Sequence, residues 1–443
     1  MSHSRSTVLL SVMDFHGRRA TIMGLGHFGG GVAAARWLAR QGAVVTVTDT
    51  ADEDALAESL ASLEDVSIDR FRLGGHAEED FRTADLIVVN PAVRPGNRLL
   101  EIARRGGARL SSEIELFLEA CPVPVVGVTG SNGKSTTAAM IAAMIEADGR
   151  RAWLGGNIGH SLLDDLPRIT ADDWAVLELS SFQLWHLSST ARMPQVGVVT
   201  GCSPNHLDWH GNYEDYIAAK QRILTCQTAV LNTHDAEVAS WRPMVTGRLC
   251  GPVPLADIPP LRVPGRHNRI DAACAAAAVA AVGCAASAVC NGLESFAGLS
   301  LRLEQMATID GRTFYNDSTA TTPESTVAAL QSLDRPVWLL AGGADKGCDL
   351  AKLTAAAAEN AQGVAFYGAV RRALHDGLIA ANSDVPCTAV ETMADALDWC
   401  WQGSRPGDAV VLSPGCSSHD QFRDFRHRGE HFVELVHALG KPS

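Results

Sequence analysis

The sequence lacks an apolar run that could cross a membrane. Its one long uncharged stretch, residues 272–290, contains Ala, Val, Gly, Cys and Ser but no Leu, Ile or Phe, so it falls short of the hydrophobicity of a spanning helix. We expect a tightly packed, Ala-rich interior helix there. Near the N-terminus only residues 8–13 are apolar, too short a segment for the core of a signal peptide. These absences predict a cytoplasmic protein with no membrane partner.

Cysteine pairs with metal-ligand spacing are also missing. The 11 cysteines are an odd number, and none is separated from another by two residues. Such scatter fits neither a disulfide framework nor a zinc site. We expect reduced thiols, most of them packed as small core residues.

Basic residues are fewer than acidic residues in this sequence. The 443-residue chain has 37 Lys and Arg against 50 Asp and Glu, a net charge of −13, which argues against a nucleic-acid or anionic-membrane partner. Any bound phosphate must therefore be held by a local site. With 46% hydrophobic residues, the chain has the composition of a globular protein, and its length suggests two to four domains.

Short apolar segments alternate with helical segments along the whole chain. This rhythm is typical of parallel sheets with crossover helices, and we predict three α/β domains in series. The strands expected from it are residues 20–24, 44–48, 86–90, 125–129, 174–179, 196–199, 337–341, 363–367 and 409–412.

The clearest chemical motif follows the expected strand 125–129. Residues 127–136 read GVTGSNGKST and lead into a helix predicted from Ser135 to about residue 147. Glycines let backbone N–H groups approach phosphate, a lysine bridges the β and γ phosphates, and a hydroxyl suits Mg²⁺. These features identify a phosphate-binding loop. The standard form has a glycine five residues before Gly133, but Val128 stands there, so this is a shorter variant of that loop. The predicted nucleotide-binding residues are Gly130, Ser131, Asn132, Gly133, Lys134, Ser135 and Thr136.

A second glycine motif, GLGHFG at residues 24–29, follows the first expected strand, and Asp49 ends the next. This spacing fits a dinucleotide fold, but alone it is a weak signal. An NAD-dependent dehydrogenase would need a hydride-accepting substrate site, whereas the next domain has a triphosphate loop. The glycine motif and the triphosphate loop together favour a Rossmann-like domain that binds a different nucleotide. In the alternative interpretation, the glycines only allow the helix to pack closely against the strand.

Polar residues downstream of the loop could bind metal. Glu178 ends an expected strand beside the loop, and carboxylate oxygens suit Mg²⁺. His206 alone is more often a core or hydrogen-bonding residue. Asp208 and His210 could equally be turn residues, and Lys220 lies in the helical segment that follows.

Ten segments resemble those of the Mur ligases and occur in the same order along the chain. The resemblance extends from about residue 20 to residue 433. They are TGSNGKST, GGNIG, LELSSFQL, SPNHLDWHG, AAKQRI, GRHNRIDA, LRLEQ, NDSTATTPEST, GGADKG and LSPGCSSHDQFRDFRHRGEHF. LELSSFQL and SPGCSSHDQF are typical of the member that adds D-glutamate to UDP-N-acetylmuramoyl-L-alanine.

The resemblance implies a fold and a reaction. The fold is a Rossmann-like N-terminal domain for the UDP-substrate (1–112), a central P-loop ATPase-like domain (113–298) and a Rossmann-like C-terminal domain for the amino acid (299–443). The reaction passes through an acyl phosphate, which hinged domains would shield from water. The implied cofactors are ATP and two Mg²⁺ ions; the implied partners are small molecules alone, with the enzyme a monomer.

The resemblance also assigns residues by motif. The implied catalytic residues are Lys134, Glu178, His206 and Lys220. The implied metal ligands are Ser135, Glu178, His206 and Lys220, where Lys220 binds as a carbamate. Further nucleotide contacts are Asn268, Arg302 and Asp317. The substrate-binding residues are His27, Phe28, Asp49, Thr50, Asn157, Thr321, Lys346, Ser418 and Phe425.

Two positions depart from the family pattern. Thr319 stands where a lysine is usual, which removes a cation near the incoming dicarboxylate, and Asp271 replaces an asparagine near the adenine. Three alternatives remain open: a Mur-type or folylpolyglutamate-type ligase with another amino acid, including L-glutamate; a non-catalytic nucleotide-sugar-binding protein; and a dehydrogenase. The metal constellation disfavours a non-catalytic binder.

Overall fold

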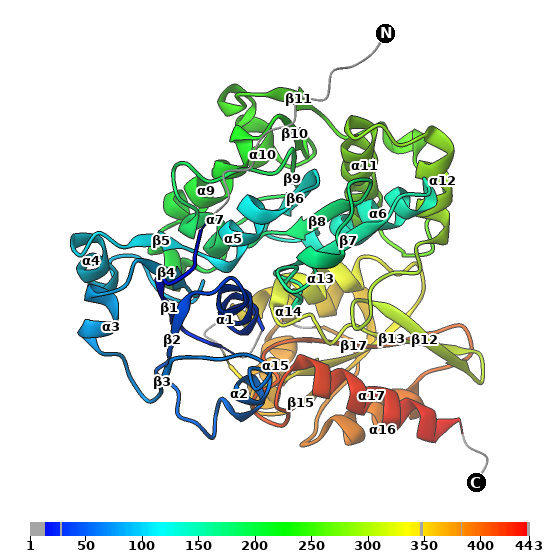
Figure 1. Ribbon diagram of the computed structural model, residues 1–443. Helices are drawn as coiled ribbons and strands as arrows, with labels where there is room; N and C mark the ends of the chain where they lie inside the picture. Colours follow the sequence, from blue (N-terminus) through cyan, green and yellow to red (C-terminus); the bar gives the residue numbers. More distant parts are fainter. Residues whose placement is uncertain (1–13, 27–28, 346–348, 382, 441–443) are drawn as a thin grey trace. The chain divides into compact units, whose positions relative to one another are not determined.

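The computed structural model describes residues 14–26, 29–345, 349–381 and 383–440 (Figure 1). Contacts divide the chain into two units, residues 1–260 with 270–295, and residues 261–269 with 296–443. The first unit contains two sheets and the second contains one. Within the described ranges, no helix has the length and apolar character needed to span a membrane.

The first sheet has the strand order β3-β2-β1-β4-β5, with every pairing parallel. Alternate strand residues face opposite layers: Ile22 and Val88 belong to the core that includes helix α1, whereas Met23 and Ile87 pack toward α3 and α4. Its elements are β1 (Arg19–Met23), α1 (Gly30–Arg40), β2 (Val44–Thr48), α2 (Ala57–Ala61), β3 (Arg70–Arg72), α3 (Glu78–Arg82), β4 (Leu86–Val89), α4 (Arg98–Arg105), β5 (Arg109–Ser111) and α5 (Glu113–Ala120).

The second sheet, also parallel throughout, has the order β11-β10-β9-β6-β8-β7. Its strands are β6 (Val125–Thr129), β7 (Ala152–Gly156), β8 (Trp174–Glu178), β9 (Val196–Val199), β10 (Thr228–Leu231) and β11 (Arg248–Cys250). Its α-helices are α6 (Lys134–Ala147), α7 (Ser181–His186), α8 (Leu207–His210), α9 (Tyr213–Gln221), α10 (Ala236–Ser240), α11 (Arg266–Ala281) and α12 (Ala286–Ser295), and short 3-10 turns are η1 (Leu166–Arg168), η2 (Arg222–Thr225), η3 (Arg242–Met244) and η4 (Leu255–Asp257).

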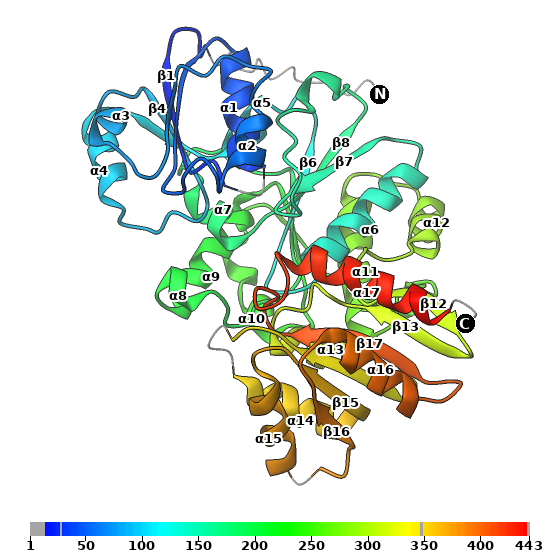
Figure 2. The same cartoon turned by 90° about the horizontal axis from the view of Figure 1, so that it is seen from below.

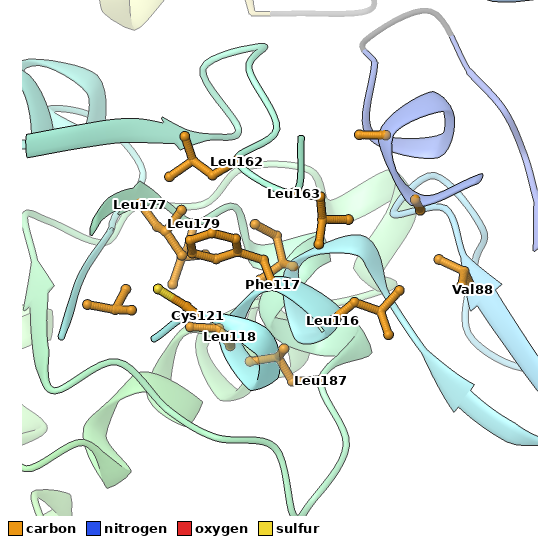
Figure 3. Packing of buried hydrophobic residues seen from close by; sticks show 14 of the residues in the cluster. Val88, Leu116, Phe117, Leu118, Cys121, Leu162, Leu163, Leu177, Leu179 and Leu187 are labelled. Atoms are coloured by element: carbon orange, nitrogen blue, oxygen red, sulfur yellow. The ribbon is translucent and has the colours of Figure 1, made fainter. Parts of the chain in front are cut away.

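One hydrophobic core joins these two sheets. Helix α5 places Phe117 against Leu177 of β8 and Leu179 just after that strand, while Leu116 extends toward Val88 of the first sheet (Figure 3). The connecting helix is therefore part of the shared core.

The third sheet has the order β12-β13-β17-β14-β15-β16, parallel except where β12 pairs with β13. Leu339 packs in the cluster with α14 and α15, whereas its neighbour Leu340 packs with α16 and α17, so helices cover both faces (Figure 2). The elements are β12 (Glu304–Ile309), β13 (Arg312–Asn316), α13 (Pro323–Leu330), β14 (Val337–Gly342), α14 (Leu350–Asn360), β15 (Ala361–Tyr367), α15 (Arg371–Ala380), β16 (Cys387–Ala389), α16 (Met393–Gly403), β17 (Ala409–Gly415) and α17 (Phe425–Leu439).

The expected fold class, three α/β domains in series, is confirmed. The single interior helix expected over residues 272–290 is wrong in one respect. Helix α11 ends at Ala281 and α12 begins at Ala286, because Gly283 adopts a left-handed conformation (φ +79°) that ends the first helix. The Ala-rich half, residues 272–279, is buried as expected. Of the ten cysteines that the structure describes, six are buried.

Candidate active site

The phosphate loop lies at the carboxyl end of β6, where α6 begins. Gly130 has φ +156°, and a Cβ there would lie 2.0 Å from Oγ1 of Thr200. Gly133 has φ +80° and forms the left-handed start of α6. Side chains at either position would strain or block the turn, which explains the two glycines of this shortened loop.

The Lys134 side chain folds back over this loop. Its Nζ donates hydrogen bonds of 3.0 Å to the carbonyl oxygens of Gly130 and of Ser131. The positive charge is therefore held at the turn that would receive phosphate.

Three polar side chains from different elements meet beside the loop. Ser135 Oγ donates a 2.5 Å hydrogen bond to Oε2 of Glu178, and Asn157 Nδ2 donates a 2.7 Å bond to Oε1 of the same carboxylate. Glu178 is only 3% exposed. A hydroxyl and a carboxylate in contact are hard oxygen donors, so this pair fits a magnesium ion.

Lys220 lies within the same unit. It is 1% exposed, its Nζ donates a 2.8 Å hydrogen bond to the Gly130 carbonyl, and it lies 4.7 Å from the centre of the Tyr216 ring. Burial lowers the pKa of Lys220 well below its ordinary value, and the charge of Lys134 acts in the same direction. As an amine this side chain offers a cation no oxygen ligand.

Tyr216 is a site residue that the sequence analysis missed. Its hydroxyl forms a 2.7 Å hydrogen bond with Ser131 Oγ, and the residue is 1% exposed. The signal was available, because Tyr216 and Lys220 are four residues apart and share one face of α9.

His206 adopts a left-handed conformation (φ +54°) just before α8, and its exposed ring packs edge-on against Phe182, 4.8 Å between centroids. His210 is not a simple turn residue: it is 5% exposed, and its Nε2 lies 2.9 Å from Ser181 Oγ. Burial lowers the pKa of His210 to about 4. Across the described part of the chain, no three His, Cys, Asp or Glu residues gather into a metal-binding group.

The glycine turn of the first sheet is held by two polar side chains. Asp49 Oδ2 accepts the N–H groups of Leu25 (2.8 Å) and Gly26 (3.3 Å), and Asn90 Nδ2 donates to the Gly24 carbonyl (3.2 Å). The sequence analysis missed Asn90, although a polar residue directly after a buried strand is a usable signal.

The other three residues expected near the UDP group are Thr50, His27 and Phe28. Thr50 is exposed. His27 and Phe28 lie outside the described residues.

In the second unit, Asp317 accepts bonds from the Leu303 N–H (3.1 Å) and Ser413 Oγ (2.7 Å), and burial raises the pKa of Asp317 to about 7. Arg302, which directly precedes Leu303, is exposed. Asn268 is 8% exposed, and its Nδ2 donates a 2.5 Å bond to the Pro264 carbonyl.

Asp271, the second departure from the family pattern, belongs to the first unit. Its carboxylate lies beside the phosphate loop, since a Cβ at Gly133 would be 2.4 Å from its Oδ1. The structure thus places this substitution against the loop backbone.

Three of the four residues expected at the amino-acid site are described, and all three belong to the second unit. Ser418 is 3% exposed, Thr321 donates its N–H to the Thr319 carbonyl (2.9 Å), and the Phe425 carbonyl accepts a 2.7 Å bond from Ser318 Oγ. Lys346 lies outside the described residues.

A phosphate loop at the carboxyl end of a parallel sheet, followed by a carboxylate on the neighbouring strand, defines a P-loop nucleotide-binding protein. Family models identify it more closely: "Mur ligase MurD-like, N-terminal domain" matches residues 18–112, "Mur ligase middle domain" residues 128–251, and "Mur ligase, glutamate ligase domain" residues 301–416. The chain belongs to the Mur ligase family.

Curated relatives match over nearly the full length. A protein of Roseiflexus sp. named UDP-N-acetylmuramoylalanine--D-glutamate ligase is 37% identical, covering 96% of this chain and 100% of the relative. A protein of the same name from Symbiobacterium thermophilum is 34% identical, covering 95% and 98%.

Solved structures with a similar fold are more distant in sequence. The UDP-N-acetylmuramate-alanine ligase MurC of Thermotoga maritima superposes with a TM-score of 0.60 at 18% identity, covering 95% of this chain and 100% of that chain. FolC of E. coli, solved with ADP, gives 0.55 at 18% identity, covering 74% and 92%.

Proposed function

We propose that this protein adds D-glutamate to UDP-N-acetylmuramoyl-L-alanine at the expense of ATP, in the cytoplasmic synthesis of peptidoglycan precursors. The observation that carries the proposal is the full-length similarity to relatives named for this reaction. The hydrogen-bonded group of Ser135, Glu178 and Asn157 beside the phosphate loop supports it independently.

The reaction has two steps. The alanyl carboxylate attacks the γ-phosphorus of ATP and ADP departs; the amine of D-glutamate then attacks the acyl carbon, and phosphate leaves as the amide forms. Lys134, held over the loop, stabilises charge on the transferring phosphoryl group.

Ser135 and Glu178 would hold one magnesium ion, which when bound neutralises phosphate charge during transfer. His206 and Lys220 would hold a second, the latter after carbamylation, because a carbamate provides the oxygen atoms that the amine lacks. The burial of Lys220 against the loop carbonyl of Gly130 supports this assignment, since an ammonium is costly in such a place.

The remaining roles follow the family motifs. In this proposal residues 1–112 bind the UDP end, residues 113–298 bind ATP and residues 299–443 bind the amino acid, in a monomer without macromolecular partners. The UDP end contacts His27, Phe28, Asp49 and Thr50, the muramoyl group contacts Asn157, ATP further contacts Asn268, Arg302 and Asp317, and D-glutamate contacts Thr321, Lys346, Ser418 and Phe425.

The decisive experiment measures ADP and phosphate release by the purified protein with each substrate omitted in turn. Release that requires both UDP-N-acetylmuramoyl-L-alanine and D-glutamate is expected. Release that requires a different amino acid or a folate-type acceptor would overturn the proposal in favour of a related ligase.

A further inference from the structure

Arg428, in the first turns of α17, is fully buried, with 0% of its surface exposed. Its Nε donates a 3.1 Å hydrogen bond to Ser318 Oγ, Nη2 a 2.9 Å bond to the Ser318 carbonyl, and Nη1 a 3.1 Å bond to the Cys416 carbonyl. Among the described residues, no carboxylate lies within ion-pair distance of this guanidinium. Its direct hydrogen bonds go to one hydroxyl and two carbonyl oxygens, which is unusual for a buried arginine.

The bonds of Arg428 connect the segments that carry the proposed amino-acid contacts. Ser318 begins the loop that contains Thr321, and Cys416 lies two residues before Ser418. Ser318 Oγ also donates to the carbonyl of Phe425. One side chain thus fixes two loops and the start of α17.

The second consideration is charge. Thr319 stands where the family has a lysine, and its N–H (3.0 Å) and Oγ1 (2.9 Å) both donate to the Leu301 carbonyl. This hydroxyl is engaged within the loop and brings no cation. A guanidinium in a low-dielectric interior acts over a longer range than a surface charge. Burial raises the pKa of Asp317, and the positive charge of Arg428 acts on that carboxyl group in the opposite direction.

We propose that Arg428 is a positioning residue for the incoming amino acid, which fixes the loops of Thr321 and Ser418 and provides buried positive charge that favours a dicarboxylic acid. This inference rests on the proposed function, because it assumes that D-glutamate binds between these loops.

The test compares D-glutamate with D-glutamine, which lacks the side-chain carboxylate. In Arg428→Met we expect kcat/KM for D-glutamate to fall at least 10-fold more than that for D-glutamine, with KM for ATP within 2-fold. Arg428→Lys, which keeps the charge but loses the planar fork, should raise KM for D-glutamate while preserving most of the discrimination.

Ser318→Ala removes the hydroxyl that accepts from Arg428 Nε and donates to the Phe425 carbonyl but leaves the charge of Arg428, so it should raise KM for D-glutamate several-fold at unchanged discrimination. If Arg428→Met does not fold, the Arg428→Lys and Ser318→Ala variants decide. Equal losses for both amino acids, or equal increases in every KM, would show a purely structural role. Absence of D-glutamate-dependent ADP release in the unmodified protein would instead refute the proposed function.

Discussion

The Ser135 hydroxyl and the Glu178 carboxylate are joined by a 2.5 Å hydrogen bond. They are 43 residues apart in sequence, yet β6 and β8 are parallel neighbours, so the start of α6 and the end of β8 meet at one edge of the sheet. This edge is where open α/β sheets bind ligands. The pair forms a small oxygen-rich site next to Lys134.

Lys134→Ala should lower kcat by about 10³-fold or more, because it removes the cation that stabilises the transferring phosphoryl group. Lys134 donates to the backbone carbonyls of Gly130 and Ser131 within its own loop, so we expect the circular-dichroism spectrum to be unchanged. The measurement is ADP release with all substrates saturating. Lys352→Ala, on the exposed face of α14, is the matched control, and near-normal coupled ATPase activity in Lys134→Ala would refute the assignment.

Lys220→Ala tests the carbamate. We expect a nearly inactive enzyme that added short-chain carboxylic acids partly rescue, because their oxygens can take the place of the carbamate. Rescue should be measured as product formation against acetate or propionate concentration, with Lys134→Ala as a variant that these acids should not rescue. Full activity of Lys220→Ala, or an unmodified ammonium in a ligand-bound crystal structure, would contradict the carbamate.

The sequence predicted the fold class because the central strands are short, apolar and separated by helices, and all nine expected strands are present with small errors at their ends. β4 ends at Val89, for example, one residue before the predicted end. Eight further strands were not predicted, namely β3, β5, β7, β10, β11, β12, β13 and β16. The break between α11 and α12 depends on one left-handed glycine, Gly283, a helix-end signal that the prediction of one continuous helix overlooked.

The site was less accessible to sequence reasoning. The phosphate loop is contiguous, so its residues could be identified directly. Arg428 could not, because its importance lies in contacts with Ser318, 110 residues away. Asn90 had a local signal as a polar residue at a strand end, but its contact with Gly24, 66 residues away, had none. Local patterns do not encode such long-range pairings.

Glu113 gives the protein a pH-dependent stability. Ser161 Oγ donates a hydrogen bond to its carboxylate, but burial is the larger effect and raises the pKa of Glu113 to about 7. In the unfolded chain the pKa returns to about 4.3, so between these values the folded protein holds a proton that the unfolded chain has lost. Stability therefore falls as pH rises through this window, by up to about 1.4 kcal/mol per pH unit.

Glu113→Gln should remove this component. Thermal unfolding from pH 4 to pH 8 should show the variant gaining stability relative to the unmodified protein as pH rises. Glu359→Gln, at an exposed position of α14, is the control. Parallel pH profiles for Glu113→Gln and the unmodified protein would contradict the raised pKa.

Thr319→Lys tests how the amino acid is held. D-glutamate has two carboxylates, and with Thr319 in place of a lysine, one of them must be bound largely by neutral donors such as the hydroxyls of Thr321 and Ser418. Neutral hydrogen bonds are about half as strong as charge-assisted ones, so we expect a high KM for D-glutamate in the unmodified protein.

The lysine should lower that KM several-fold and leave kcat within about 2-fold, the pattern of added ground-state binding. It loses the Oγ1 bond to the Leu301 carbonyl, but the backbone N–H bond to the same oxygen does not depend on the side chain. Thr319→Met, of similar length and without charge, is the control and should not lower KM. The assay should profile D-glutamate, L-glutamate and D-aspartate, because a clear preference for L-glutamate or for a non-acidic amino acid would show that D-glutamate specificity does not extend to this chain.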